Sequence, residues 1–262
     1  MGSEHGLTMR KPFLLLVLTL LPLSARAAED GALSLSPAVV MLRGEHGQST
    51  TQILSLTNGT SRPFSFDLVA QDVVIRDGKR AFVAAGTIAG SIASTAVFSQ
   101  NHVDVPSGQT VSVRMTVTLP PATSQRAILA MFRGTNRIMS GNVPMFASLA
   151  TLLTFAVSND LQLTASPLSV RPQSASTNLG FTQSCTNSGQ EPYVAKGVMA
   201  VLDEKGALVG RSELQPHRLL PGESVDLGGD FAGDLVPGRY RVFVTYDYDG
   251  RTLSRSADVV IR

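Results

Sequence analysis

The chain has 262 residues, of which 43% are hydrophobic and 16% charged, and its formal net charge is +2. This length is enough for one large domain or two of ordinary size. The charges are sparse and interspersed, so the chain lacks the basic field that would attract nucleic acid or an anionic membrane. Gly, Thr, Ser and Val are plentiful and Trp is absent, which favours β-structure with many turns.

Residues 1–27 have the pattern of a secretory signal peptide. Arg10-Lys11 is a positive start, Phe13–Leu21 is an apolar run, and Ala25–Ala27 is a small-x-small cleavage pattern. The run is too short to span a bilayer as a mature helix. An N-terminal membrane anchor is the alternative interpretation.

We expect cleavage after Ala27, with residues 1–8 as an extension before a better start at Met9. The mature chain is then predicted to be periplasmic or secreted, with no stable membrane span. The whole chain has 22 basic and 20 acidic side chains, and the signal holds three and one of these, which leaves 19 of each.

The chain has one cysteine, Cys185. It has no partner for an intramolecular disulfide, and it lies too far from the cleavage point to carry a lipid. Because it sits in the alternating run LGFTQSCTN, we expect a small buried core residue. A reactive thiol is the alternative, but no His or Lys lies nearby in the sequence to lower its pKa.

Two strings in the chain follow one pattern. SLTNGTSRPF (Ser55–Phe64) and SCTNSGQEPY (Ser184–Tyr193) both read Ser-x-Thr-Asn, four variable residues, then Pro and an aromatic. Further landmarks recur in the same order around them: a Ser-Pro pair upstream, then VPSGQTV or LLPGESV, then a proline corner and the runs AILAMF or YRVFVTY. This order indicates two copies of one all-β module.

The repeated string is interpreted as a corner between two strands. Asn58 and Asn187 end a strand and open a turn, by bonding the backbone or by adopting a left-handed conformation. The proline then starts the next strand and the aromatic enters the core. Asp77-Gly78 and Asp249-Gly250 are hairpin dipeptides, and Lys205-Gly206 is a weaker one.

About seven strands per copy suit an immunoglobulin-like sandwich. We therefore predict an all-β fold of two tandem immunoglobulin-like β-sandwiches, residues 28–158 and 159–262, after the signal peptide. Residues 86–98 form a predicted loop, because their glycines outweigh a short helical turn.

The order of these motifs resembles the PapD-like periplasmic chaperones of pilus assembly. The motifs are LSLSPAVVMLRG, ILSLTN, PFSFDLV and VPSGQTVSVRMTVTLP. The resemblance covers nearly all of the mature chain and implies two sandwiches and a role in assembling surface or fimbrial proteins. Two basic anchors of the family are absent: Pro37 is followed by Ala38 and Val39, and Met145–Val157 holds no Lys or Arg. In the family, an arginine two residues after the early proline holds the carboxylate of a bound subunit. The resemblance therefore does not extend to carboxylate capture.

No catalytic or metal-binding motif was found in the sequence. His46, His102 and His217 are isolated from one another and from Cys185, and no nucleophile elbow or phosphate loop is present. We predict no catalytic residue, no metal site and no cofactor.

Several polar motifs are interpreted as architecture. Asp247–Gly250 has part of a calcium-loop pattern but lacks its distal Glu, so a hairpin turn is expected. Asp226, Asp230 and Asp234 are expected to solubilise a loop edge. Asn58-Gly59-Thr60 is a formal glycosylation sequon and is interpreted as the turn described above.

One apolar segment, FASLATLLTFAVS (residues 146–158), is the candidate binding strand. It is apolar on both faces, and Leu149, Thr151, Leu153, Phe155 and Val157 share one of them. Such a strand either lies buried in the core or is offered to a partner as a free edge. In PapD-like chaperones the corresponding strand completes another protein's sheet.

The sequence thus predicts an exported, non-enzymatic protein that binds an extracytoplasmic protein or peptide by β-strand addition, as an assembly chaperone. The alternative is a structural or adhesive surface module without a client. A hydrolase whose site is not evident in the sequence is the third hypothesis.

Overall fold

The computed structural model describes residues 31–140, 142–172, 179–233 and 235–262. The predicted signal peptide, its cleavage site at Ala27 and the predicted loop residue Asp234 lie outside these ranges. Within them the helical element is a three-residue 3-10 turn, η1 (Ala93–Thr95), and no helix is long and apolar enough to cross a membrane.

The first half of the chain folds into two facing sheets. One sheet has the order β1-β3-β8-β6, and the other has the order β2-β12-β9-β4-β5 with β7 beside β4. The strands of these sheets are β1 (Leu33–Ser36), β2 (Val39–Arg43), β3 (Ser49–Asn58), β4 (Phe64–Arg76), β5 (Lys79–Ala84), β6 (Val97–Phe98), β7 (His102–Val105), β8 (Thr110–Thr118), β9 (Ala127–Gly134) and β12 (Ser148–Ala156). A separate two-stranded hairpin is formed by β10 (Ile138–Ser140) and β11 (Val143–Met145).

The second half repeats this plan. One sheet has the order β13-β15-β14 with β19 beside β15, and the other has the order β17-β16-β20-β21 with β18 beside β16. Its strands are β13 (Leu163–Ala165), β14 (Ser169–Pro172), β15 (Leu179–Asn187), β16 (Tyr193–Asp203), β17 (Leu208–Glu213), β18 (His217–Leu219), β19 (Ser224–Phe231), β20 (Gly238–Tyr248) and β21 (Arg251–Ile261).

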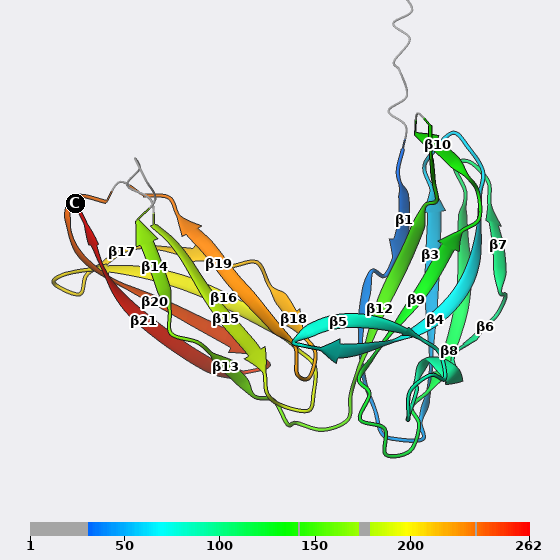
Figure 1. Ribbon diagram of the computed structural model, residues 1–262, viewed down its shortest axis with the longest axis horizontal. Coiled ribbons are helices and arrows are strands. Elements are labelled where there is room, and N and C mark those ends of the chain that lie inside the picture. The colour runs from blue at the N-terminus through cyan, green and yellow to red at the C-terminus, as the bar shows by residue number, and fades with distance from the viewer. Residues whose placement is uncertain (1–30, 141, 173–178, 234) are drawn as a thin grey trace, which may run out of the picture.

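Each half has the strand order of an immunoglobulin-like sandwich, in which the first, second and fifth strands face the third, sixth and seventh. Figure 1 shows the two sandwiches meeting at one end. Their buried side chains form two separate large clusters, one from residues 54–155 and one from residues 161–261. The predicted fold class is confirmed, and we propose the boundary between residues 158 and 159 as the domain boundary.

The repeated corners make equivalent hydrogen bonds in the two sandwiches. The Nδ2 atom of Asn58 donates to the carbonyl oxygens of Arg62 (2.6 Å) and Val105 (2.9 Å). The Nδ2 atom of Asn187 donates to those of Glu191 (2.9 Å) and Leu219 (3.2 Å).

Both asparagines are fully buried, and each bridges two carbonyl groups of its own sandwich. Their backbone is not left-handed, because the non-glycine residues with positive φ among those described are Asp77, Ala122 and Asp249. The prediction of a strand corner is therefore confirmed, and the role of the asparagine is its side-chain bridge.

The predicted hairpin turns are present. Asp77 and Gly78 join β4 to β5 with φ of 51° and 74°, and Asp249 and Gly250 join β20 to β21 with φ of 55° and 82°. The aspartates occupy a region that favours Asn, Asp and Gly, as in two-residue hairpin loops. The short helical turn η1 lies inside the predicted loop of residues 86–98.

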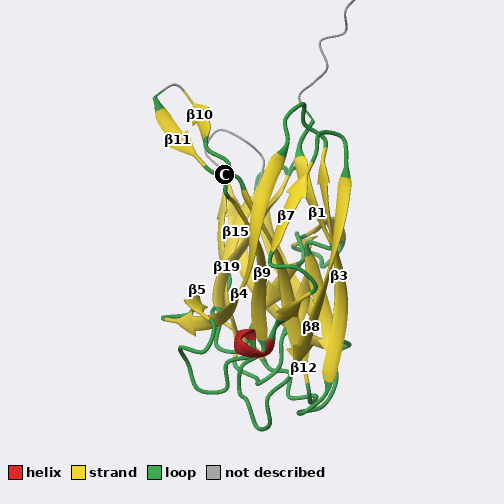
Figure 2. Cartoon of the chain, turned by 90° about the vertical axis from the view of Figure 1, so that its right-hand side faces the viewer, coloured by secondary structure: helices red, strands yellow, loops and turns green. Residues whose placement is uncertain are grey.

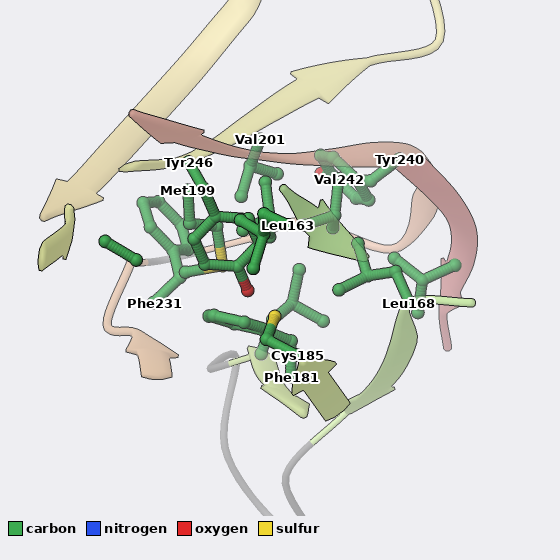
Figure 3. Close-up of a cluster of buried hydrophobic side chains, with 14 of the residues drawn as sticks. Leu163, Leu168, Phe181, Cys185, Met199, Val201, Phe231, Tyr240, Val242 and Tyr246 are labelled. Atoms are coloured by element: carbon green, nitrogen blue, oxygen red, sulfur yellow. The ribbon is translucent and has the colours of Figure 1, made fainter. Parts of the chain in front are cut away.

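Cys185 is fully buried in the second core, as predicted (Figure 3). Its neighbours in this cluster include Phe181, Met199 and Tyr246. Burial raises the pKa of the Cys185 thiol, which disfavours the reactive thiolate.

Candidate functional site

The candidate binding strand β12 has strand neighbours on both sides over part of its length. It pairs antiparallel with β9 from Ser148 to Thr154, and parallel with β2 from Leu152 to Ala156. The Leu152 amide donates to the Ala38 carbonyl oxygen at 3.0 Å, where the β2 side of the ladder begins. Among the described strands none pairs with Ser148–Thr151 on that side, so this part of β12 is a free edge.

The structure places the five predicted binding residues on the core side of β12. Leu153 and Phe155 are buried in the first core, and Leu149 and Val157 pack partly buried against it. Thr151 is fully buried, and its hydroxyl donates to the Pro37 carbonyl oxygen at 2.7 Å. Partner contact by these side chains stays a prediction, with Leu149 and Thr151 within the free edge and Leu153 and Phe155 engaged in the core.

The β10–β11 hairpin and the adjacent Phe146 form an exposed apolar feature near this edge, which sequence reasoning did not single out. The fractional exposures are 52% for Met139, 61% for Val143, 53% for Met145 and 56% for Phe146. Figure 2 shows the hairpin projecting beyond the sheets. Since Phe146 lies two residues before β12, the exposed apolar residues lead directly into the free edge.

The base of the hairpin is held at a fixed point of the sheet. An ideal Cβ at Gly134 would lie 2.0 Å from the Ala147 carbonyl oxygen, so only glycine allows this close approach. The Thr135 amide donates to the Ser65 carbonyl oxygen at 2.9 Å, and the Ser65 amide donates to Oδ1 of Asn136. The hairpin therefore leaves β9 in a defined direction.

A histidine lies between two aspartates near this base. Nδ1 of His102 is 2.7 Å from Oδ1 of Asp67, and its Nε2 is 3.4 Å from Oδ1 of Asp104, which accepts a hydrogen bond from the Ser65 hydroxyl. The hydrogen bond with Asp67 raises the pKa of His102. The group is solvent-exposed, and the described part of the chain holds no cluster of three side chains suited to a metal.

The two sandwiches are joined by a buried carboxylate. Glu191 is fully buried, and Nε of Arg126 lies 3.1 Å from its Oε2 atom. The same oxygen accepts the Val157 amide at 3.1 Å, and Oε1 accepts the Ser158 hydroxyl at 2.8 Å. The corner of the second sandwich thereby holds the end of β12 and the connection that follows it.

A second contact docks the β4–β5 hairpin on the second sandwich. Nε of Arg80 lies 2.8 Å from Oε1 of Glu223, and the Ser224 amide donates to the Gly78 carbonyl oxygen at 2.8 Å. A small apolar cluster closes this junction, with the buried members Val73, Ala127, Leu152 and Leu220.

The strands and cores define a class of protein, an all-β chain of two tandem immunoglobulin-like sandwiches. No family model matches the chain, and no curated protein matches it. The chain resembles solved structures of fimbrial chaperones over most of its length.

A chaperone–tip adhesin complex of CFA/I fimbriae biogenesis matches at 13% identity and a TM-score of 0.44, over 88% of this chain and 98% of that one. The CsuC–CsuE pre-assembly complex of Acinetobacter baumannii matches at 10% identity and a TM-score of 0.46, over 86% of this chain and 98% of that one. The Escherichia coli chaperone DraB matches at 16% identity and a TM-score of 0.41, over 87% of this chain and 98% of that one.

Proposed function

We propose that this chain is an exported, non-enzymatic protein that binds an extracytoplasmic protein or peptide by β-strand addition, as a chaperone in the assembly of surface proteins. The partner strand would pair with the free edge at Ser148–Thr151, and its side chains would contact Met139, Val143, Met145 and Phe146. The observation that carries this proposal is the continuity between the exposed apolar hairpin and an unpaired strand edge.

The physical argument concerns unpaired backbone groups. A free strand edge offers a row of amide and carbonyl groups to another chain, and soluble proteins usually block such an edge with charges, proline or a covering loop. The sequence Met145–Thr151 carries no charge and no proline. An added strand would gain backbone hydrogen bonds from the edge and apolar contacts from the hairpin.

The experiment is affinity purification of the tagged chain from the extracytoplasmic fraction, followed by mass spectrometry of the bound proteins. The test variant is Val143→Lys combined with Met145→Lys. We expect it to fold normally, since both side chains are more than half exposed, and to lose its partner.

The matched control is Ile53→Lys combined with Val97→Lys, which changes two apolar residues of similar exposure, 57% and 66%, on the opposite sheet. This control should retain the partner. Equal recovery with both variants would contradict the proposal, as would a wild-type chain that stays at the surface without any partner, the result expected of a structural or adhesive module.

A further inference from the structure

A cavity of about 480 Å³ lies at the end of the second sandwich that carries the C-terminus (Figure 1). The last residues of β16, the first residues of β20 and the last residues of β21 line it. The junction with the first sandwich lies at the opposite end of β16, where Glu191 pairs with Arg126 just before that strand begins. Ligand sites in proteins have volumes of about 300–1,000 Å³, so this cavity has room for a small molecule.

The floor of the cavity is an apolar part of the outer sheet face. Leu202 follows the fully buried Val201 along β16, so its side chain lies on the outer side of the sheet. Phe243 follows the fully buried Val242 along β20 in the same way. Both outer side chains are only partly buried, and Val260 of β21 is 53% exposed. The cavity therefore offers uncovered apolar surface to a ligand.

Three of the charged groups around this floor already have partners within the sandwich. Nε of Arg241 lies 2.6 Å from Oδ1 of Asp258, and its Nη2 donates to Oδ2 at 3.1 Å. Oδ1 of Asp203 accepts the amides of Lys205 at 2.9 Å and of Ala207 at 2.8 Å. These bonds hold the wall of the cavity and the turn at its rim in place.

Two further charged side chains line the cavity without a partner. Arg239 and Glu204 are exposed, and neither side chain forms an ion pair or a hydrogen bond with any residue that the structure describes. They belong to neighbouring strand ends, because Asp203 pairs with Tyr240 in the ladder between β16 and β20. The cavity thus presents one free cation and one free carboxylate beside its apolar floor.

We infer that this cavity binds a free α-amino acid with a large apolar side chain. Such a molecule carries a carboxylate, an ammonium group and an apolar group on one carbon, which are the three complements of the cavity. The carboxylate would accept parallel hydrogen bonds from Arg239 and the ammonium group would donate to Glu204. The side chain would cover Leu202 and Phe243 and remove their apolar surface from water. This site stands independently of the β10–β11 hairpin, and its test requires no client protein.

The experiment is titration calorimetry of the mature chain with L-phenylalanine and L-leucine as probes. We expect a dissociation constant of about 1 mM or tighter. Three analogues each lack one of the complementary groups: N-acetyl-L-phenylalanine has no ammonium group, L-phenylalanine amide has no carboxylate, and glycine has no apolar side chain. Each analogue should bind more weakly than L-phenylalanine by about tenfold or more.

The test variants are Arg239→Gln and Glu204→Gln. Each should weaken the binding of L-phenylalanine by about tenfold or more, because a charge-assisted hydrogen bond is lost. Both side chains are exposed, so both variants should fold and melt as the wild type does. The matched control is Arg114→Gln, which removes the exposed guanidinium of a β8 residue in the first sandwich and should bind as the wild type does.

Weaker binding by both cavity variants, with unchanged binding by the control, would support the inference. Failure of L-phenylalanine and L-leucine to bind the wild type at about 10 mM would overturn it, since that concentration exceeds the expected dissociation constant. Equal binding by the wild type and either cavity variant would also overturn it. Binding of N-acetyl-L-phenylalanine as tight as that of L-phenylalanine would do the same, because the ligand would then not be held by both charges.

Discussion

The two sandwiches differ most in the hairpin that ends each of them. In the second, β20 and β21 pair without interruption from Gly238 opposite Ile261 to Tyr248 opposite Arg251, and a two-residue turn joins them. In the first, the equivalent strands β9 and β12 pair only from Ala127 opposite Thr154 to Arg133 opposite Ser148. Residues 135–140 and 142–147 lie between them, outside this pairing, and include the exposed β10–β11 hairpin.

The parts that the copies share are architecture. Asn58 and Asn187 bridge equivalent carbonyl groups, and the amides of Gly108 and Gly222 donate to their carbonyl oxygens at 2.8 Å in both cases. A binding role is therefore better sought where the copies diverge. The divergence also includes the fourth residue after each asparagine, since Arg62 is exposed and Glu191 is buried.

Replacement of Glu191 should have the largest effect on stability. Glu191→Ala leaves the largely buried side chain of Arg126 without a counter-charge and the Val157 amide without an acceptor. We expect a loss of about 3–5 kcal/mol in the free energy of unfolding, the cost of breaking a buried ion pair, measured by urea denaturation. The matched control is Arg62→Ala at the equivalent corner, which should have almost no effect. Similar losses of unfolding free energy for Glu191→Ala and Arg62→Ala would contradict the structural difference between the two corners.

Substitutions in the core and in the hairpin of the candidate site should differ in their effect on the free energy of unfolding. Leu153→Ala removes a side chain with 1% exposure and should cost about 2–5 kcal/mol. Met145→Ala lies on the exposed hairpin and should change stability by about 0.5 kcal/mol or less. Denaturant unfolding checks both, and a large loss for Met145→Ala would show that the hairpin belongs to the core.

The two corner asparagines should be equally important. Asn187→Ala leaves the buried carbonyl groups of Glu191 and Leu219 without their side-chain donor. Asn58→Ala does the same to the buried Val105 carbonyl and to the part-buried Arg62 carbonyl, to which the Thr60 hydroxyl also donates at 3.2 Å. We expect each to cost about 2 kcal/mol, the range for unsatisfied buried polar groups. If one variant were as stable as the wild type, the corners would not be equivalent.

The smallest expected effect is the pH dependence from His102. Its folded-state pKa is raised by the hydrogen bond with Asp67, so the stabilisation is present below the unfolded pKa of about 6.5 and is lost as the pH rises through the folded value. The wild type should therefore melt at a slightly lower temperature above this window than below it, relative to His102→Asn. Identical pH profiles for the two proteins would show that the ion pair contributes nothing.

The turns and corners were predictable from the sequence because they depend on local chemistry. Asp77-Gly78 and Asp249-Gly250 adopt the positive φ that such dipeptides favour. The recurrence of Thr-Asn with a downstream proline identified equivalent corners, although the bridging by the asparagine side chain depends on carbonyl groups of distant residues such as Val105 and Leu219.

The candidate site was only partly predictable. The apolar segment of residues 146–158 includes β12, but its alternation could not show that β2 covers Leu152–Ala156 and leaves Ser148–Thr151 free. The β10–β11 hairpin was missed because its strands have three residues each and include Pro144, which reads as a loop. The pairing of Arg126 with Glu191 joins residues 65 positions apart and leaves no local pattern.

The most direct test of the central proposal is hydrogen–deuterium exchange on the chain with and without its co-purified partner. The free edge at Ser148–Thr151 should exchange more slowly in the complex, by about tenfold or more, because a partner strand would bond its backbone groups. The continuous β20–β21 hairpin should be unchanged. Protection of the β20–β21 hairpin instead, with Ser148–Thr151 exchanging as in the free chain, would contradict the proposal.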